Sequence, residues 1–246
     1  MNIRHILFMA LVALCATACE SNLTDAQTIM DKAFETAGGQ KYLQSTITFD
    51  FRQRHYVATR NGGAYSYERI TQDSTDTIHD FVSNEGYRRE INGAAVHVPD
   101  SMAARYTSST NSVIYFALLP YGLNDPAVNK KLLGETTIKG KPYYLVQVTF
   151  NPEGGGEDFE DVFLYWIHQK DFTIDYLAYS FEEEDETSFR FREAYNARVI
   201  NGIRFQDYIN YSPEDNSIPL DSAESFYKKG KLEELSRIET EHPEVR

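Results

Sequence analysis

A two-residue alternation of apolar and polar side chains is the feature of this sequence that most limits its fold. Residues 46–52 read Thr-Ile-Thr-Phe-Asp-Phe-Arg, so every second side chain is apolar. Successive side chains of a strand point to opposite faces of a sheet, and this pattern therefore predicts a strand with one buried face. Asn-Gly pairs at 61–62, 92–93 and 201–202 are typical of two-residue hairpin turns. Together these signals predict antiparallel strands joined by short turns.

The rest of the chain repeats this pattern. Further strands are predicted over residues 64–71, 77–82, 85–91, 94–98, 132–138, 143–150, 159–168, 172–181, 188–200 and 203–211. The aromatic content of 13%, with 17 Tyr and 15 Phe, also favours strands. Short connections make neighbours along the chain neighbours in a sheet. We therefore expect a mainly β (α+β) fold, a single curved antiparallel sheet or half-open β-barrel meander, in one domain over residues 24–246.

An N-terminal helix is predicted before the first strand. Residues 25–37 place Ala, Ile, Met and Phe side chains three and four positions apart, which is helical spacing. Thr24 is the predicted N-cap, and Gly38-Gly39 supplies the C-terminal stop. We expect this helix to pack against the concave face of the sheet.

A second, central helix is predicted within residues 99–121. It contains the most apolar run of the chain after residue 18, residues 113–119, and is expected to cover the concave face together with the first helix. Residues 221–235 predict a further helical segment near the end of the chain.

The first 18 residues have the organisation of an export signal. A short basic start is followed by nine apolar residues, 6–14, and by a small-residue region ending at Ala18. The apolar run is too short to span a bilayer, which needs about 20 residues. Ala16-Thr-Ala18 followed by Cys19 resembles a bacterial lipobox, although Ala16 stands where a larger aliphatic residue is usual. The alternative is an ordinary secretory signal, cut after Ala18 without addition of lipid.

Lipidation would account for both cysteines. Cys15 would leave with the signal peptide, and Cys19 would carry the lipid at the new N-terminus, followed by a short tether over residues 19–23. An anchor with more than one acyl chain holds a protein stably at a membrane. We therefore expect an outer-membrane-anchored lipoprotein of the cell envelope, facing the periplasm or the outside.

The charge of the chain excludes one class of partner. The formal net charge is −13 and the pI is about 4.9, so the protein repels phosphate backbones and anionic headgroups. We expect no nucleic-acid partner, and a monomer whose contact with a membrane is made by the lipid anchor.

Catalytic signatures are absent from the sequence. There is no Gly-x-Ser-x-Gly elbow, no Ser-x-x-Lys arrangement in the context expected of a catalytic serine, no zinc-type His spacing and no nucleotide-binding glycine motif. We expect no cofactor and no enzymatic activity, although acid pairs distant in sequence leave a hydrolase open as a third hypothesis.

One acidic loop is a candidate for calcium. The loop over residues 153–161 holds five carboxylates and three glycines, and oxygen-rich loops suit Ca²⁺. The spacing does not follow the EF-hand pattern, which favours a solvated loop over a metal site. The carboxylates are those of Glu153, Glu157, Asp158, Glu160 and Asp161.

Three stretches carry a resemblance to a known family. They are Met-Asp-Lys-Ala-Phe-Glu-Thr-Ala-Gly-Gly-Gln-Lys-Tyr at 30–42, Asp-Val-Phe-Leu-Tyr-Trp-Ile-His at 161–168, and Phe-Arg-Glu-Ala-Tyr at 191–195 with Asn-Gly-Ile-Arg-Phe at 201–205. They resemble envelope lipoproteins of the Bacteroidota type and, more distantly, the LolA/LolB outer-membrane lipoprotein-sorting superfamily. The resemblance implies a half-open barrel whose concave face, lidded by helices, holds acyl chains.

A cavity of that kind allows candidate ligand contacts to be chosen from the strand faces. The helix over 113–119 would then be a movable lid, or alternatively a plug that fills the barrel as core. The candidate cavity residues are Phe49, Phe51, Tyr65, Tyr67, Ile114, Phe116, Val146, Val148 and Trp166. A one-residue slip of strand register would invert their faces.

Two functions are favoured over the hydrolase hypothesis. The first is a non-enzymatic lipoprotein that binds or carries an acyl or other lipid ligand. The second is a surface or periplasmic lipoprotein with a filled core that binds glycans or proteins through exposed tyrosines. A continuous apolar cavity would favour the first, and exposed coplanar aromatic residues would favour the second.

Overall fold

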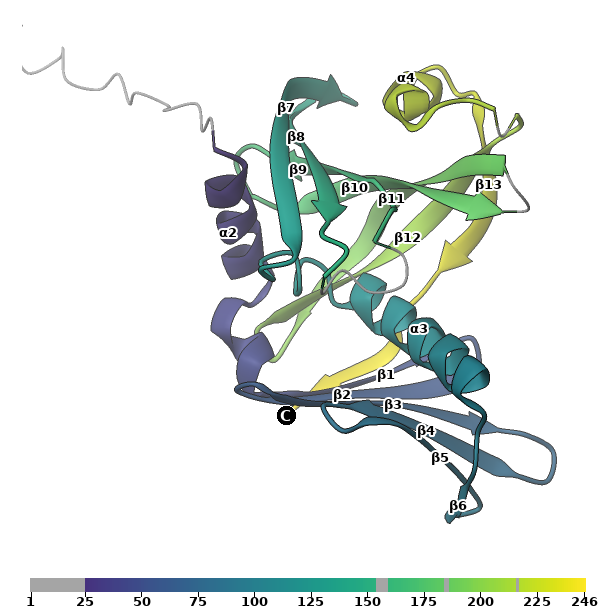
Figure 1. The fold of residues 1–246 in the computed structure, drawn as a ribbon. Coiled ribbons are helices and arrows are strands. Elements are labelled where there is room, and N and C mark those ends of the chain that lie inside the picture. Colours follow the sequence, from purple (N-terminus) through teal and green to yellow (C-terminus); the bar gives the residue numbers. More distant parts are fainter. Residues whose placement is uncertain (1–24, 154–158, 184–185, 216) are drawn as a thin grey trace, which may run out of the picture.

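The computed structural model describes residues 25–153, 159–183, 186–215 and 217–246. Within these ranges the chain forms two seven-stranded antiparallel sheets with helices between and beside them (Figure 1). The expected mainly β fold, with an N-terminal and a central helix, is confirmed. The predicted meander is divided between two hydrogen-bonded sheets.

The first sheet contains the N-terminal strands and the C-terminal one. Its strand order is β14 (Glu241–Val245), β1 (Thr46–Phe51), β2 (Arg54–Asn61), β3 (Ala64–Gln72), β4 (Thr77–Ser83), β5 (Gly86–Ile91) and β6 (Ala94–Val96). β14 was not predicted from the sequence. It returns from the end of the chain to pair with β1, where Ile47 lies opposite Val245.

The second sheet is an uninterrupted meander. Its strand order is β13 (Leu232–Ile238), β12 (Ile203–Pro213), β11 (Glu186–Ile200), β10 (Ile174–Glu183), β9 (Phe163–His168), β8 (Lys141–Phe150) and β7 (Val128–Ile138). Neighbours in sequence are therefore neighbours in this sheet throughout. This was expected for β7 to β12, whereas β13 joins β12 after a longer connection that contains η2 and α4.

Two of the three predicted Asn-Gly turns form as expected. At Asn92-Gly93 and Asn201-Gly202 all four φ angles are positive, at 52°, 79°, 47° and 86°. Positive φ at both central residues is what a type I′ hairpin turn requires. The third turn is shifted by one residue, because Asn61 pairs with Ala64 and the two glycines between them form the loop.

α2 (Ala26–Ala37) forms where the helical spacing predicted it. Its N-cap is Asp25 rather than Thr24, because the Asp25 carboxylate accepts hydrogen bonds from the backbone N–H groups of Gln27 and Thr28. Gly38 ends the helix with a φ of 142°, a conformation that favours glycine. A β-carbon there would also lie 3.1 Å from the carbonyl oxygen of Gly202. η1 (Gly39–Gln44) then leads into β1.

α3 (Asp100–Ala117) lies between the two sheets (Figure 1). Its C-terminal part is packed on both sides. Ile114 is buried against Phe49 and other residues of the first sheet. On the other side, the hydroxyl of Tyr115 lies 2.7 Å from that of Tyr165 in β9, and the ring of Phe116 contacts Tyr179 in β10. The apolar end of α3 is therefore part of the core.

The N-terminal half of α3 rests on a buried polar network. Asp80, 1% exposed, accepts hydrogen bonds from Arg69 (2.7 and 3.0 Å), Arg89 (2.6 and 3.1 Å) and Tyr87. Burial alone would raise the pKa of Asp80, but these three hydrogen-bond donors outweigh it and hold the pKa below its ordinary value. Arg69 also donates to the Ser109 hydroxyl on α3, at 2.9 Å. The network thus joins α3 to β3, β4 and β5.

The second sheet is buried on both faces. On the face toward α2 and α3, which we call the α2 side, Val146, Val148 and Tyr165 belong to one hydrophobic cluster with Ile29 and Met30 of α2. The opposite face, the α4 side, carries a second cluster. Its buried members are Ile138, Tyr143, Leu164, Trp166, Tyr176, Ala178, Phe189, Phe191 and Ala223.

The cover on the α4 side is shorter than the sequence predicted. η2 (Leu220–Ser222) and α4 (Ala223–Lys228) occupy the start of the segment 221–235 that was expected to be helical. Gly230, with a φ of 65°, ends this helix, and the remainder forms β13 against β12. Pairing with a neighbouring strand overrides the helix propensity of this Leu- and Glu-rich segment.

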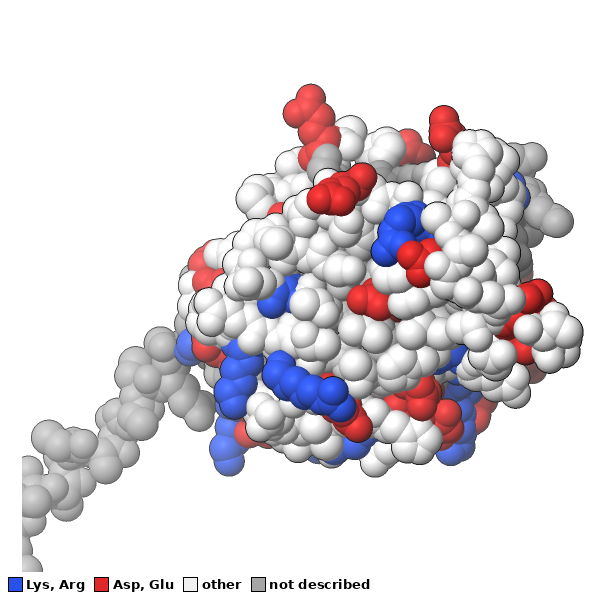
Figure 2. Space-filling view, turned by 90° about the horizontal axis from the view of Figure 1, so that it is seen from below, with Lys and Arg blue, Asp and Glu red and all other residues white. Residues whose placement is uncertain are grey.

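Acidic and basic side chains are mixed on the lower face of the molecule, as oriented in Figure 1. Figure 2 shows acidic and basic side chains distributed over this face, with broad uncharged areas between them. Asp50 in β1 lies 2.7 Å from His55 and 3.0 Å from His242. Among the described residues, no helix is both long enough and apolar enough to cross a membrane.

Removal of the Asp80 carboxylate tests the polar seat of α3. Asp80→Ala leaves Arg69 and Arg89 with buried, unpaired charge, which costs about 3–5 kcal/mol of folding free energy. We expect a loss of this size in urea unfolding followed by circular dichroism. Glu85→Ala, at an exposed turn between β4 and β5, is the control and should change stability by less than about 0.5 kcal/mol. Equal stability of the two variants would contradict the role given to Asp80.

Candidate ligand-binding pocket

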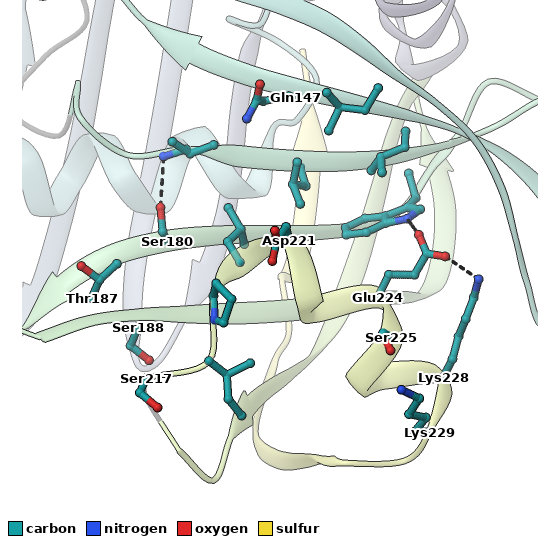
Figure 3. A pocket seen from close by; sticks show the side chains of 18 residues that line it. Gln147, Ser180, Thr187, Ser188, Ser217, Asp221, Glu224, Ser225, Lys228 and Lys229 are labelled. Carbon is teal, nitrogen blue, oxygen red and sulfur yellow. Dashed lines mark hydrogen bonds and ion pairs between the residues drawn. The ribbon is translucent and has the colours of Figure 1, made fainter.

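A pocket of about 940 Å³ lies on the α4 side of the second sheet. Its floor is the sheet itself, mainly β8 and β9, and its cover is the segment from Ser217 to Lys229, which includes η2 and α4 (Figure 3). The volume is at the upper end of the range of about 300–1,000 Å³ that is usual for small-molecule sites.

The floor is apolar because β9 alternates between two buried faces. Leu164 and Trp166 point to the α4 side, whereas Phe163, Tyr165 and Ile167 point to the α2 side. In β8, Leu145 is paired with Trp166 and shares its face. The apolar residues that line the pocket are Leu133, Leu145, Val162, Leu164, Trp166, Ile218, Pro219 and Leu220.

Glu224 fastens α4 to this floor. Its carboxylate accepts hydrogen bonds from the indole N–H of Trp166 (2.7 Å) and the hydroxyl of Thr136 (2.5 Å), and it pairs with the ammonium of Lys228. Burial alone would raise the pKa of Glu224, but hydrogen bonds from Lys228, Thr136 and Trp166 outweigh it and lower the pKa. Glu224 therefore stays ionised in the wall of the pocket at neutral pH.

Tyr227 provides a second attachment one turn away. Its ring stacks on Phe191 with 4.4 Å between ring centroids, and its hydroxyl donates a 2.5 Å hydrogen bond to Glu193. Burial and the Glu193 carboxylate both raise the pKa of Tyr227, so the phenol stays protonated and remains a donor. Ala223 is fully buried beneath the same helix. α4 is thus held at three successive points.

The two ends of the pocket differ in chemistry. Figure 3 shows the hydroxyl side chains of Thr187, Ser188 and Ser217 at one end. Glu224, Lys228 and Lys229 lie at the other end, with Asp221 between the two groups. An apolar floor with polar groups at its ends fits an amphipathic molecule.

The nine residues chosen from the sequence as cavity contacts are distributed over three clusters. Phe49 and Ile114 are buried between α3 and the first sheet, with Phe51 and Tyr67 packed against them. Tyr65 lies beside Tyr67, with 4.9 Å between ring centroids. Val146, Val148 and Phe116 belong to the α2 side of the second sheet, whereas Trp166 belongs to the α4 side.

Trp166 is the member of that set that lines the pocket. The other lining residues were not selected from the sequence, because the cover over residues 217–229 approaches β8 and β9 only in the folded chain. The unbroken apolar run over residues 163–167 was the available signal, since such a run marks a strand with two apolar faces.

The acidic loop can be assessed only in part. Glu157 and Asp158 lie outside the described residues, whereas Glu153, Glu160 and Asp161 lie within them. Within the described part of the chain, no group of three or more His, Cys, Asp or Glu residues is placed to hold a metal ion.

The chain is thus a mainly β protein of two sheets, with a pocket large enough for a small-molecule ligand. The chain belongs to DUF6503, a family of unknown function whose model matches residues 4–240. None of the curated proteins matches this sequence.

Several solved structures are similar in fold. A LolA superfamily protein from Nitrosomonas europaea has 12% identity and a TM-score of 0.48, with 92% of this chain and 94% of that one covered. A DUF1329 family protein from Desulfovibrio piger has 10% identity and a TM-score of 0.41, covering 79% and 89%. A domain from Vibrio parahaemolyticus, assigned as an outer membrane lipoprotein-sorting protein, has 7% identity and a TM-score of 0.42, covering 83% and 100%.

Replacement of Glu224 tests how the cover is attached. Glu224→Ala leaves the buried indole N–H of Trp166 without an acceptor, which costs about 1–3 kcal/mol. We expect that loss in urea unfolding, together with a red shift in the emission of Trp166, the single tryptophan of the chain. Glu224→Gln keeps an acceptor oxygen and should lose less. Wild-type stability and emission in Glu224→Ala would contradict the attachment.

Proposed function

We propose that this protein is an envelope lipoprotein that binds an apolar, acyl-containing ligand and does not alter it chemically. The observation that carries the proposal is the pocket between the second sheet and residues 217–229, with its volume of about 940 Å³ and its apolar floor. A ligand that covers the apolar surface of such a site removes it from water, which favours binding. The reported likeness to a LolA superfamily protein is in keeping with this proposal.

The proposed ligand site is the α4 side of the second sheet. Of the nine candidate cavity residues selected from the sequence, Trp166 lines this site. Seven of the other eight residues pack around α3, the first sheet or the α2 side of the second sheet, and Tyr65 packs beside Tyr67. Their assignment to a ligand cavity stays a prediction.

The alternative function, glycan or protein binding through exposed tyrosines, has less support. All 17 tyrosines lie within the described ranges, and each of them is buried or half-buried. The exposed large hydrophobic residues of the described chain are Leu133, Val199 and Leu235, none of which is aromatic. An aromatic platform for sugars would need rings that face solvent.

The location of the protein follows from the N-terminal sequence. We propose that residues 1–18 are a signal peptide and that Cys19 carries the lipid which holds the domain at the outer membrane. Residues 1–24 lie outside the described structure, so this part of the proposal rests on the sequence.

The length of the bound chain tests the pocket. Each buried CH₂ contributes about 0.8 kcal/mol, so lengthening an alkanol by two carbons should lower Kd by roughly tenfold until the pocket is full. We expect this trend for octanol, decanol and dodecanol, followed by the emission of Trp166. Gln147→Phe, which fills the floor, should weaken binding at every length.

The matched control for that series lies on the same strand. Thr149→Phe adds the same ring two residues along β8, outside the pocket, and should bind as the wild type does. Absence of binding for all three alkanols, or equal binding by the two Phe variants, would refute the proposed site.

The anchor is tested separately in cells. Cys19→Ala should abolish incorporation of labelled palmitate and release the protein from the membrane fraction, because the acyl chains supply the anchoring free energy. Cys15→Ala, within the proposed signal peptide, should leave both unchanged. Equal labelling of the two variants would contradict lipidation at Cys19.

A further inference from the structure

Four charged residues line the pocket, and two of them form an ion pair with each other. They belong to Asp221, Glu224, Lys228 and Lys229. Glu224 and Lys228 form an ion pair, and the remaining acceptor capacity of Glu224 is used by Trp166 and Thr136. Lys228 also donates to the Thr136 hydroxyl, at 3.1 Å. This pair is therefore turned toward the protein and is occupied in the absence of ligand.

Lys229 differs from its neighbour in having no such partner. Among the described residues, its ammonium takes part in none of the ion pairs or hydrogen bonds. It is exposed at the ionic end of the pocket, beside Lys228 and close in sequence to Lys231. Three lysines within four residues are notable in a chain with a net charge of −13. The mouth of the pocket thus offers an available cation in an acidic protein.

We propose that the pocket selects an acyl chain that carries an anionic group, a carboxylate or a phosphate. The anion pairs with Lys229, and the chain lies over Leu145 and Leu164 toward the hydroxyl end. This inference rests on the proposed function, because it requires that the same pocket binds an apolar chain.

Asp221 is the second charged residue of the pocket wall that forms no ion pair among the described residues, and its charge opposes the binding of an anion. Asp221 is exposed, and within the described part of the chain its carboxylate accepts only a local hydrogen bond from Ser222, at 3.3 Å. Its negative charge repels an anionic ligand, whereas Lys229 attracts it. Removal of each charge should therefore change the affinity in opposite directions, which a change in packing alone would not produce.

The expected effect is modest because both groups face solvent. A charge pair in such a place changes an affinity by about two- to fivefold. Salt weakens the effect, since the Debye length falls from about 10 Å at 0.1 M to about 3 Å at 1 M.

The test compares ligands of one length that differ in the head group. Dodecanoate, dodecyl phosphate and dodecanol are titrated at pH 8, at concentrations below micelle formation, with Trp166 emission as the readout. Lys229→Ala should raise Kd for both anions about two- to fivefold and leave dodecanol unchanged. Asp221→Asn should lower Kd for the anions, and both effects should fade at 1 M salt. Lys170→Ala, an exposed lysine in the turn after β9, is the control and should bind all three probes as the wild type does.

The possible results separate this inference from the proposed function. If dodecanol binds but Lys229→Ala and Asp221→Asn leave anion binding unchanged, the inference is overturned and the proposed function stands. If none of the three probes binds, both are overturned. If inorganic phosphate alone competes with dodecyl phosphate at millimolar concentration, the site recognises a free anion, and the proposal of an anionic acyl ligand is overturned.

Discussion

Burial of the second sheet on both faces is the constraint on which the rest of this structure depends. In β9, five consecutive residues from Phe163 to Ile167 are each at most 6% exposed. A strand of this kind needs a separate cover on each side, because neighbouring side chains point in opposite directions. α2 and α3 cover one side, and the segment over residues 217–229 covers the other.

The two covers are unequal, and the pocket follows from the difference. α2 and α3 have 12 and 18 residues, whereas α4 has six. A helix of six residues spans about 9 Å, at 1.5 Å per residue, so it cannot close the face of a sheet whose neighbouring strands are about 4.8 Å apart. Glu224 and Tyr227 hold this short helix at one end of the face. The apolar floor beyond it, over Leu145 and Leu164, remains open to a ligand.

α3 is held by two different kinds of interaction. Its N-terminal half rests on Asp80, whose carboxylate is shared by two guanidinium groups, and its C-terminal half is packed among apolar and tyrosine side chains. A buried network of charges adds little net stability, because the attraction between the charges is largely offset by the cost of removing them from water. Removing one member is nevertheless costly, since it leaves the other charges buried and unpaired. The polar half therefore positions the helix over the first sheet, and the apolar half joins the two sheets.

Local features of the structure could be read from the sequence because their causes are local. The alternation at 46–52 identified β1, and the spacing in residues 25–37 identified α2 and its buried face. The turns at Asn92 and Asn201 formed as expected because their positive φ angles suit Asn and Gly. Near the C-terminus the same criteria failed in part: residues 232–235, the start of β13, were expected to be helical, and β14 was not expected at all.

Those two strands form because of partners far along the chain, β12 and β1, and local propensity contains no information about such partners. For the same reason the pocket could not be located in advance. The sequence by itself determined that strands such as β9 have two apolar faces. Only the tertiary structure decided which helix covers each face, because that depends on contacts between segments such as Trp166 and Glu224, 58 residues apart.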